Sequence, residues 1–156
     1  MPSNISSAIV FIVNALTSLY LLVLLLRFWL PWLRADFRNP LAQGILRLTS
    51  PLVVPLRRIV PPVGRLDTAT VLVAFIIQYL TVLLLLLILG QTAGIGPIAL
   101  TAVVKLVVLS INLFVYAIFI RIILSWLAQG AYNPATAIIT TLTEPVLRPF
   151  RRLVPP

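Results

Sequence analysis

The sequence predicts an all-α integral membrane protein with three transmembrane helices and two short amphipathic interfacial helices, built as a tandem parallel repeat. Of its 156 residues, 61% are hydrophobic and only 10% are charged, whereas a soluble domain has roughly 45–50% apolar and about 25% charged residues. Three apolar segments reach the length of about 20 residues that a helix needs to cross a bilayer. In addition, one pattern of 36 residues occurs twice.

The composition also limits the chemistry of the chain. It contains no cysteine and no histidine, and its single methionine is Met1. Disulfide bonds, zinc sites, Cys or His nucleophiles and haem ligation by His, Met or Cys are therefore excluded for this chain acting alone. Its three acids, Asp36, Asp67 and Glu144, form no evident pair for acid–base catalysis. We predict a protein that is not an enzyme and that binds no cofactor or metal.

The predicted spans cover residues 8–30, 69–89 and 98–127. The runs LYLLVLLL and TVLLLLLILG are apolar on all sides, as expected for helices that face lipid. The N-terminus, MPSNISS, has no cationic side chain, and the apolar run after it is longer than the hydrophobic region of a signal peptide. We therefore predict that the first span is retained.

The positive charges predict the orientation of the chain as a multi-pass membrane protein. The net charge is +9, and eleven of the twelve cations are arginines. Nine of these arginines lie in segment 31–68 and in the C-terminal tail, while the loop GQTAGIG at 90–96 has none. The positive-inside rule places segment 31–68 and the C-terminus in the cytoplasm and the N-terminus outside. Because the arginines lie next to the spans, they favour a membrane surface over nucleic acid as the partner.

The repeat becomes visible when the chain is shifted by 94 residues. Arg27–Pro62 then aligns with Arg121–Pro156 without a gap, and sixteen of the 36 positions are identical. Chance similarity between apolar segments would not match these residue types, so we interpret the pattern as an internal duplication. The repeats cover residues 1–94 and 95–156 and cross the membrane in the same direction. Besides arginines, the identical positions include Trp32 and Trp126, Asn39 and Asn133, Pro40 and Pro134, Thr49 and Thr143, Pro51 and Pro145, and Pro55 and Pro149.

Each repeat continues from its span into a proline- and arginine-rich segment, 39–62 or 133–156, that predicts an interfacial helix. Asn39 is a good N-cap, and Pro40 suits the first helical position. We expect the helices to stop at Pro51 and Pro145, and the later prolines to favour an extended, polyproline-like course. At about a dozen residues such helices are too short to span and suit the headgroup plane. Their apolar stripes are Leu41, Ile45, Leu48 and Leu52 in the first copy and Ala135, Ile138, Ile139 and Leu142 in the second.

The doubled pattern places an arginine at the end of a span, then Trp, Asn-Pro, Thr-x-Pro and Pro-x-Arg-Arg. It resembles the YggT family of small bacterial membrane proteins, whose relatives include the YlmG proteins and chloroplast counterparts. The resemblance implies a protein of the bacterial inner (plasma) membrane that is linked with osmotic and other extracytoplasmic stress and with ion homeostasis. The genes of YlmG relatives lie near cell-division genes, and the chloroplast relatives are linked with haem attachment to cytochrome b6.

Two-repeat members of that family resemble a four-span protein, in which each repeat consists of a span, the interfacial motif and a second span. In this sequence the first Pro-Pro is followed by another span, whereas the chain ends at the second Pro-Pro. The resemblance therefore implies either a three-span member, whose second repeat lacks its final span, or a truncated product.

Arg27 and Arg121 are the first candidate site. Each lies about one turn inside the predicted cytoplasmic end of its span, at matching positions of the repeat. Because a cation inside the bilayer is costly, the pair could line a site for an anion or a lipid headgroup between the helices. Alternatively, each long side chain could extend to the interface and reach water or phosphate there.

The second candidate is a set of polar residues within the spans, represented by Asn14, Gln78 and Asn112, with Lys105 nearer the outside. These side chains could form a polar conduit for ions, but hydrogen bonds between helices are the more ordinary role. A cation pathway needs carboxylates or a carbonyl filter, and no acid lies within a span. We therefore predict no cation pore formed by this chain alone.

The third candidate is a pair of cytoplasmic arginine and proline platforms, made by Arg47, Arg57, Arg58, Arg148, Arg151 and Arg152. Near an anionic surface each such charge contributes about 1 kcal/mol, although the same charges also enforce topology. We predict a scaffold or assembly factor that offers these platforms to anionic lipid or to a membrane-protein partner, or that forms a homo-oligomer. The alternative is a subunit of an ion or solute pathway involved in osmotic homeostasis.

Overall fold

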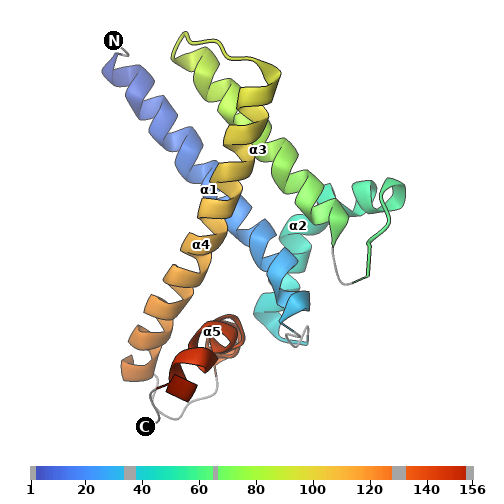
Figure 1. Cartoon of the computed structure of the whole chain (residues 1–156), viewed down its shortest axis with the longest axis vertical. Coiled ribbons are helices and arrows are strands. Elements are labelled where there is room, and N and C mark those ends of the chain that lie inside the picture. Colours follow the sequence, from blue (N-terminus) through green and yellow to red (C-terminus); the bar gives the residue numbers. More distant parts are fainter. Residues whose placement is uncertain (1–2, 34–37, 65–66, 128–132, 154–156) are drawn as a thin grey trace.

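The computed structural model of the chain describes residues 3–33, 38–64, 67–127 and 133–153. Nearly all of these residues are α-helical, which confirms the predicted all-helical class (Figure 1). The helices are α1 (Asn4–Trp32), α2 (Pro40–Ile59), α3 (Thr68–Ile88), α4 (Ile95–Leu127) and α5 (Pro134–Leu153).

Three of the described helices, α1, α3 and α4, are long and apolar enough to cross a membrane. They correspond to the predicted spans, although α1 and α4 are longer than predicted, at 29 and 33 residues. Figure 1 shows α1 and α3 side by side in opposite directions, with α4 crossing them. The start of α1 and the α3–α4 loop lie at one end of the molecule, and α2 and α5 lie toward the other.

The helix ends follow from local chemistry. The Oγ of Ser3 accepts the backbone N–H of Ser6 at 3.2 Å and caps α1, and the Asn39 side chain caps α2. Gly90, with φ of +69°, follows Leu89, the C-cap of α3. A residue in the left-handed region lets the chain leave a helix abruptly, and glycine adopts this conformation without the clash that a Cβ would cause. This turn allows α4 to start only a few residues later.

The prediction that Pro51 and Pro145 stop the interfacial helices is wrong. Helix α2 continues through Pro51 and Pro55 to Ile59, and α5 continues through its two prolines to Leu153. Pro55 and Pro149 therefore lie inside the helices and not in a polyproline-like segment. Pro61 and Pro62 follow the end of α2, and Pro155 and Pro156 lie outside the described residues.

The physical reason lies in side-chain hydrogen bonds that hold the turn before Pro51 in the helix. Pro51 itself lacks the N–H that would bond to the carbonyl of Arg47, so the helix continues at the cost of that one bond. The hydroxyl of Tyr20 donates to the Leu48 carbonyl at 3.1 Å, and that of Thr49 donates to the Ile45 carbonyl at 2.8 Å. In α5 the hydroxyl of Thr143 makes the same bond to the carbonyl four residues earlier, also at 2.8 Å. In addition, prolines four residues apart share one face of a helix, and here that face is exposed.

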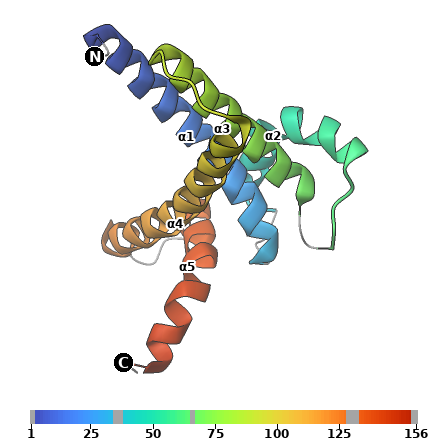
Figure 2. The ribbon, with the colours of Figure 1, turned by 45° about the horizontal axis from the view of Figure 1, so that its top comes forward.

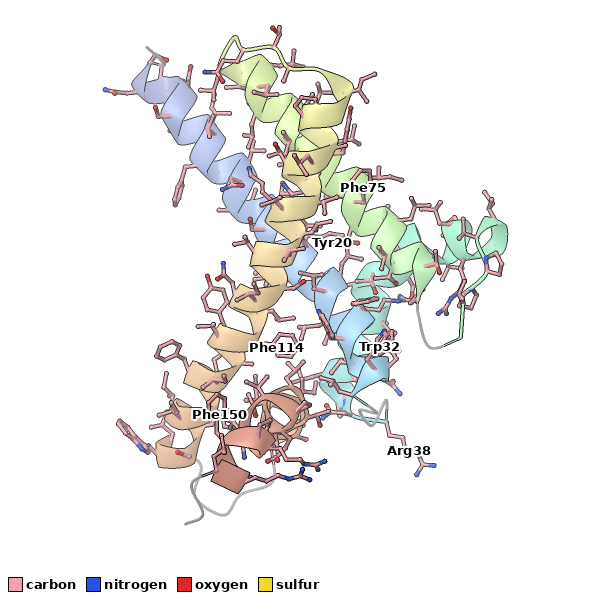
Figure 3. All side chains as sticks on the ribbon, viewed as in Figure 1. Tyr20, Trp32, Arg38, Phe75, Phe114 and Phe150 are labelled. Carbon is pink, nitrogen blue, oxygen red and sulfur yellow. The ribbon has the colours of Figure 1, made fainter. Side chains whose placement is uncertain are left out.

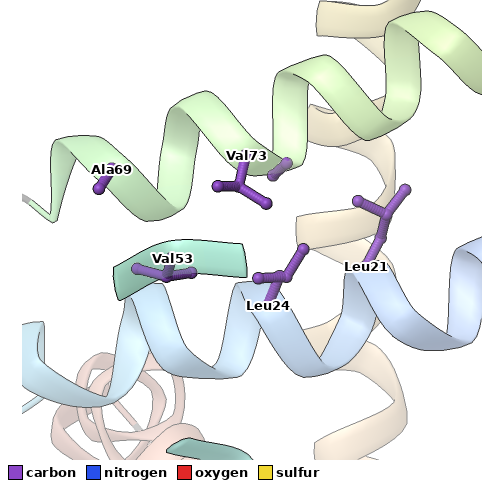
Figure 4. Packing of buried hydrophobic residues seen from close by; sticks show 6 residues of the cluster. Leu21, Leu24, Val53, Ala69 and Val73 are labelled. Carbon is purple, nitrogen blue, oxygen red and sulfur yellow. The ribbon is translucent and has the colours of Figure 1, made fainter. Parts of the chain in front are cut away.

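The first core cluster lies where α1, α2 and α3 meet (Figure 4). Val53 of α2 is fully buried and inserts between Leu24 of α1 and Ala69 of α3. Small residues such as Ala69 and Ala74 let helices approach closely, and close packing rather than the hydrophobic effect drives helix association in lipid. Val53 lies beyond Pro51, so this packing requires the helix to continue past the proline.

The second core cluster joins the two copies of the repeated pattern. Its buried members come from α1, α2, α4 and α5 and are Leu30, Ala42, Ala117, Ile138 and Leu142. At its edge the rings of Trp29 and Phe114 meet edge to face, with centroids 5.2 Å apart. Trp32, labelled in Figure 3 near the end of α1, and Trp126 are exposed. The apolar stripes differ between copies: Leu41, Leu48 and Leu52 are exposed, whereas Ile138 and Leu142 are buried.

Candidate functional site: two arginine clusters

The first cluster is centred on Arg27, which is 5% exposed near the end of α1. Its Nη1 donates to the Thr49 hydroxyl at 2.7 Å, to the Ser50 hydroxyl at 3.2 Å and to the Leu46 carbonyl at 3.4 Å. The Thr49 hydroxyl is held in place because it donates in turn to a carbonyl of its own helix. Arg27 therefore fastens α2 to the end of α1.

A carboxylate from a third helix completes the first cluster. Asp67 caps α3, and its Oδ2 accepts the hydroxyl of Thr70 at 2.7 Å. The same oxygen lies 3.2 Å from Nη2 of Arg57 and 3.7 Å from Nε of Arg27. The Asp67 side chain is only 7% exposed, so this is a largely buried carboxylate between two guanidinium groups. The cluster consists of Arg27, Thr49, Arg57 and Asp67.

The second cluster is centred on Arg121, near the end of α4. Its Nη1 donates to the Thr143 hydroxyl at 2.6 Å, and its Nη2 donates to Oε1 of Glu144 at 3.0 Å. Nη1 of Arg151 lies 3.2 Å from the same oxygen. The hydrogen bond from Arg121 and the charges of the two arginines lower the pKa of Glu144, outweighing the opposing effect of desolvation. The cluster consists of Arg121, Thr143, Glu144 and Arg151.

The two clusters are formed by residues that lie 94 positions apart in the sequence, with the exception of the acid. The first acid, Asp67, lies at the start of α3, whereas the second, Glu144, occupies the position of Ser50 in the first copy. Each cluster has two guanidinium groups for one carboxylate and so carries an excess positive charge. The structure thus gives both predicted intramembrane arginines, Arg27 and Arg121, protein partners at the ends of their helices.

The remaining platform arginines are exposed on α2 and α5. These are Arg47, Arg58, Arg148 and Arg152. Beside the first cluster lies a cavity of about 280 Å³, lined by Arg27, Pro31, Leu46, Arg57 and Asp67. On α5 a groove of about 610 Å³ is lined by Pro145, Arg148, Pro149, Arg152 and Leu153. Guanidinium groups in fixed positions suit phosphate and carboxylate ligands.

The repeated asparagines act as helix caps, and one of them also joins the copies. Oδ1 of Asn39 accepts the N–H of Leu41 at 2.9 Å, and Oδ1 of Asn133 accepts the N–H of Ala135 at 3.0 Å. The buried Asn39 also donates from Nδ2 to the carbonyl of Pro134 at 2.9 Å. Helices α2 and α5 therefore meet at their N-terminal ends.

The predicted polar residues within the spans lie around one cavity. Asn14 of α1, Gln78 of α3 and Asn112 of α4 line a space of about 220 Å³, together with Ser18 and Lys105. The three amides make no hydrogen bond to any other residue in the described part of the chain, so they do not form the interhelical bonds that we expected from the sequence. The structure therefore brings these residues together in the lining of one cavity, without hydrogen bonds between them.

Sequence reasoning missed the residues that complete the arginine clusters. The sequence gives Asp67 and Glu144 a possible role only in catalysis, and it indicates no binding role for Tyr20 or Ser50. The available signal was charge: a buried arginine needs a counter-charge, and the sequence has only three acids. Four predicted arginine and proline positions, Arg34, Arg65, Pro155 and Pro156, lie outside the described residues, and so does the acid Asp36.

The chemistry of the described residues is that of cationic sites. Among these residues no group of three or more His, Cys, Asp or Glu side chains could hold a metal ion. The two clusters instead provide paired, partly exposed cationic sites at the ends of apolar helices.

The sequence matches known proteins over almost its whole length. The sequence profile of the CCB3/YggT family matches residues 6–88 and 100–156. An uncharacterized protein of Pseudomonas aeruginosa is 42% identical over 154 residues, which are 97% of this chain and 78% of that protein. The uncharacterized protein YggT of Escherichia coli K12 is 33% identical over 150 residues, 96% of this chain and 77% of that protein. No solved protein structure gives a significant match. The chain belongs to the CCB3/YggT family.

Proposed function

We propose that this protein is a non-enzymatic membrane scaffold or assembly factor that presents two arginine platforms to anionic lipid or to a partner protein. The observation that carries the proposal is the pair of arginine clusters. In each cluster one arginine of an adjacent pair, Arg57 or Arg151, contacts the acid. Its neighbour, Arg58 or Arg152, is exposed. The clusters therefore hold α2 and α5 against the spanning helices, while Arg58 and Arg152 remain available to bind a ligand.

The proposal includes the orientation and the duplication. By the positive-inside rule, the end of the molecule that holds α2 and α5 faces the cytoplasm of a bacterial plasma membrane. The equivalent contacts of Thr49 and Thr143 support a duplicated unit that serves the same purpose twice. The exposed Leu41, Leu48 and Leu52 support an amphipathic α2 that lies in the interface with these side chains toward the acyl chains.

The charges suit an anionic surface. Each exposed arginine near such a surface contributes about 1 kcal/mol, and the interaction falls off within a Debye length. The arginines stand on helices that are fixed to the spans, so little conformational entropy is lost when a ligand binds. Pre-organisation of this kind favours a fixed docking site over a flexible basic tail. The link with osmotic or extracytoplasmic stress is part of the proposal and derives from the family resemblance.

A lipid-capture experiment tests the platforms directly. The whole chain is purified in mild detergent and offered mixed anionic and zwitterionic lipid, and bound lipid is counted by native mass spectrometry. We expect Arg58→Ala with Arg152→Ala to lose bound anionic lipid, while Arg58→Lys with Arg152→Lys keeps it because the charge is retained. Equal lipid binding by both double variants would contradict the platform.

A crosslinking experiment identifies the partner in the cell. Ile59 and Leu153 are equivalent, strongly exposed positions next to the arginine pairs, so each can carry a photo-crosslinking residue. The scaffold predicts a discrete crosslinked protein or a self-crosslink from both positions, with loss of the adduct when Arg58 and Arg152 are replaced by alanine. Crosslinks to bulk lipid alone would restrict the platforms to membrane attachment.

One observation favours the alternative, a subunit of an ion or solute pathway. The amides of Asn14, Gln78 and Asn112 surround a cavity between the three spanning helices. In this alternative, vesicles that contain the protein would be permeable to ions or small solutes, and Gln78→Leu or Asn112→Leu would change that permeability. Vesicles as tight as protein-free controls would leave the scaffold as the function.

A further inference from the structure

The cavity between α1, α3 and α4 lies near the middle of the spanning region. Gln78 is the central residue of the 21-residue α3, so it stands about 15 Å from either end at a rise of 1.5 Å per residue. A hydrocarbon core is about 30 Å thick, which places this side chain near the bilayer centre. The other polar residues that line the cavity are Asn14, Ser18, Lys105 and Asn112.

Gln78 is a largely buried residue whose amide has no protein partner. The residue is 5% exposed, and it makes no hydrogen bond to another residue in the described part of the chain. Its amide atoms are not sealed from the cavity, so they are free to form hydrogen bonds with water or a ligand there. The cavity of about 220 Å³ has room for one. For comparison, a water molecule occupies about 30 Å³ in the liquid.

The charged groups near the cavity indicate whether the ligand is an anion or a cation. Lys105 is the one charged side chain in its lining, and the acids of the described residues, Asp67 and Glu144, take part in the arginine clusters. A cation would be repelled by the ammonium group and would find no carboxylate. An anion would neutralise Lys105, whose charge is costly at this depth, and would accept hydrogen bonds from the amide and hydroxyl groups.

The site is also separate from the repeated arginine motif. The position 94 residues before Lys105 is Phe11, and the position equivalent to Asn14 is Val108, so the charge is not duplicated, although Ser18 and Asn112 occupy equivalent positions. Lipid phosphates lie at the bilayer surface, about 15 Å from Gln78 by the helix rise given above. This depth favours a free ion over a headgroup.

We propose that this cavity binds a small monovalent inorganic anion, with chloride as the representative probe. The Lys105 ammonium supplies the charge, and the amides of Asn14, Gln78 and Asn112 and the hydroxyl of Ser18 supply further hydrogen-bond donors. The site does not depend on the scaffold role, because it shares no residue with the platforms.

The test measures chloride binding by the whole chain in nanodiscs of zwitterionic lipid. Line broadening of the ³⁵Cl resonance is followed as chloride replaces gluconate at constant ionic strength. We expect a saturable component in the wild type that is weakened by about tenfold or more in Lys105→Met, because hydrogen bonds to a charged group carry free energy of this order. Lys105→Arg, which keeps the charge, should retain it. Thr101→Val, one turn earlier on α4 and outside the cavity lining, should also retain it.

If Lys105→Met does not fold, two other measurements test the site: chloride binding by Gln78→Leu and the effect of chloride on the unfolding temperature. Gln78→Leu should weaken the saturable component while Lys105 remains in place. Chloride should also raise the unfolding temperature of the wild type relative to gluconate, and this difference should shrink in Gln78→Leu. A saturable component that is equally strong in wild type, Lys105→Met and Gln78→Leu would overturn the proposal, as would broadening that never saturates in the wild type.

Discussion

The two arginine clusters share their arginines and threonine but differ in the origin of the acid. Arg27 and Arg121 each donate to a fully buried threonine on the following helix, at 2.7 and 2.6 Å. In the first cluster the carboxylate comes from a separate helix, α3, through Asp67. In the second it comes from the same helix as the threonine, through Glu144.

Because the acids come from different helices, the two clusters connect different sets of helices. The first cluster connects α1, α2 and α3, and its central arginine and acid are 5% and 7% exposed. The second connects only α4 and α5, and its arginine and acid are 24% and 33% exposed. The arginine–threonine contact therefore belongs to the repeated unit, whereas the counter-charge depends on which helix packs nearby. Burial should then decide how much each acid matters.

Asp67→Asn should give the largest loss of stability. The change removes the counter-charge of the buried Arg27, which typically costs about 3–5 kcal/mol. Asparagine is as good an N-cap as aspartate, so the capping of α3 is retained. Unfolding of the purified protein in a denaturing detergent would measure the loss. A loss no larger than that of Glu144→Gln would contradict the role of burial.

Ser50→Glu should partly rescue Asp67→Asn. The substitution places an acid at the position that Glu144 occupies in the second copy, within reach of Arg27, which already contacts the Ser50 hydroxyl. We expect a recovery of about 1.5–3 kcal/mol, the contribution of a hydrogen bond to a charged group. Ser50→Gln is the matched control and should recover less. No difference between the glutamate and glutamine variants would mean that the two copies are not interchangeable.

Thr49→Val and Thr143→Val should have similar effects, because this part of the cluster is shared. Valine keeps the shape of threonine but removes the acceptor of the arginine and the donor to the helix carbonyl. Each change should cost about 1.5–3 kcal/mol. The same unfolding assay compares them, with the exposed Thr101→Val as the control. An effect in one copy only would argue that the arginine–threonine contact is not equivalent.

Glu144→Gln should have a small effect that depends on pH. The folded-state pKa of Glu144 is lowered by the hydrogen bond from Arg121 and by the charge of Arg151, so its ion pairs stabilise the fold above the ordinary pKa of 4.5. This contribution is lost as the pH falls through the lowered folded-state pKa. Thermal unfolding should therefore separate wild type from Glu144→Gln at neutral pH, and the two should converge in acid. A difference that does not change with pH would exclude the charge as its cause.

The sequence predicts the helical class and the spans well because hydropathy and length decide them. It fails at Pro51 because the helix there is maintained by tertiary contacts, such as the hydrogen bond from Tyr20 to Leu48. Local preference cannot reveal a donor that is 28 residues away along the chain. The packing of Val53 beyond this proline is invisible for the same reason.

For the candidate sites, residue types were predictable but their partners were not. The arginines stand out because they are costly at the ends of apolar spans. Their pairing with Asp67 or Glu144 depends on how α3 and α5 pack, which the repeat does not specify. Likewise, Asn14, Gln78 and Asn112 are visible as polar residues in the spans, but only the crossing of α1, α3 and α4 places them around one cavity.

Arg58→Ala with Arg152→Ala should have the smallest effect on stability. Both side chains are exposed, and surface substitutions of this kind usually change the free energy of unfolding by less than about 0.5 kcal/mol. Their neighbours Arg57 and Arg151 contact the acids, so the clusters remain intact in the double variant. When unfolding and lipid capture are measured on the same preparation, the double variant should keep the stability of the wild type but lose bound anionic lipid. If the double variant also loses stability, Arg58 and Arg152 support the fold themselves. In that case one arginine of each pair does not hold the helices while its neighbour binds lipid.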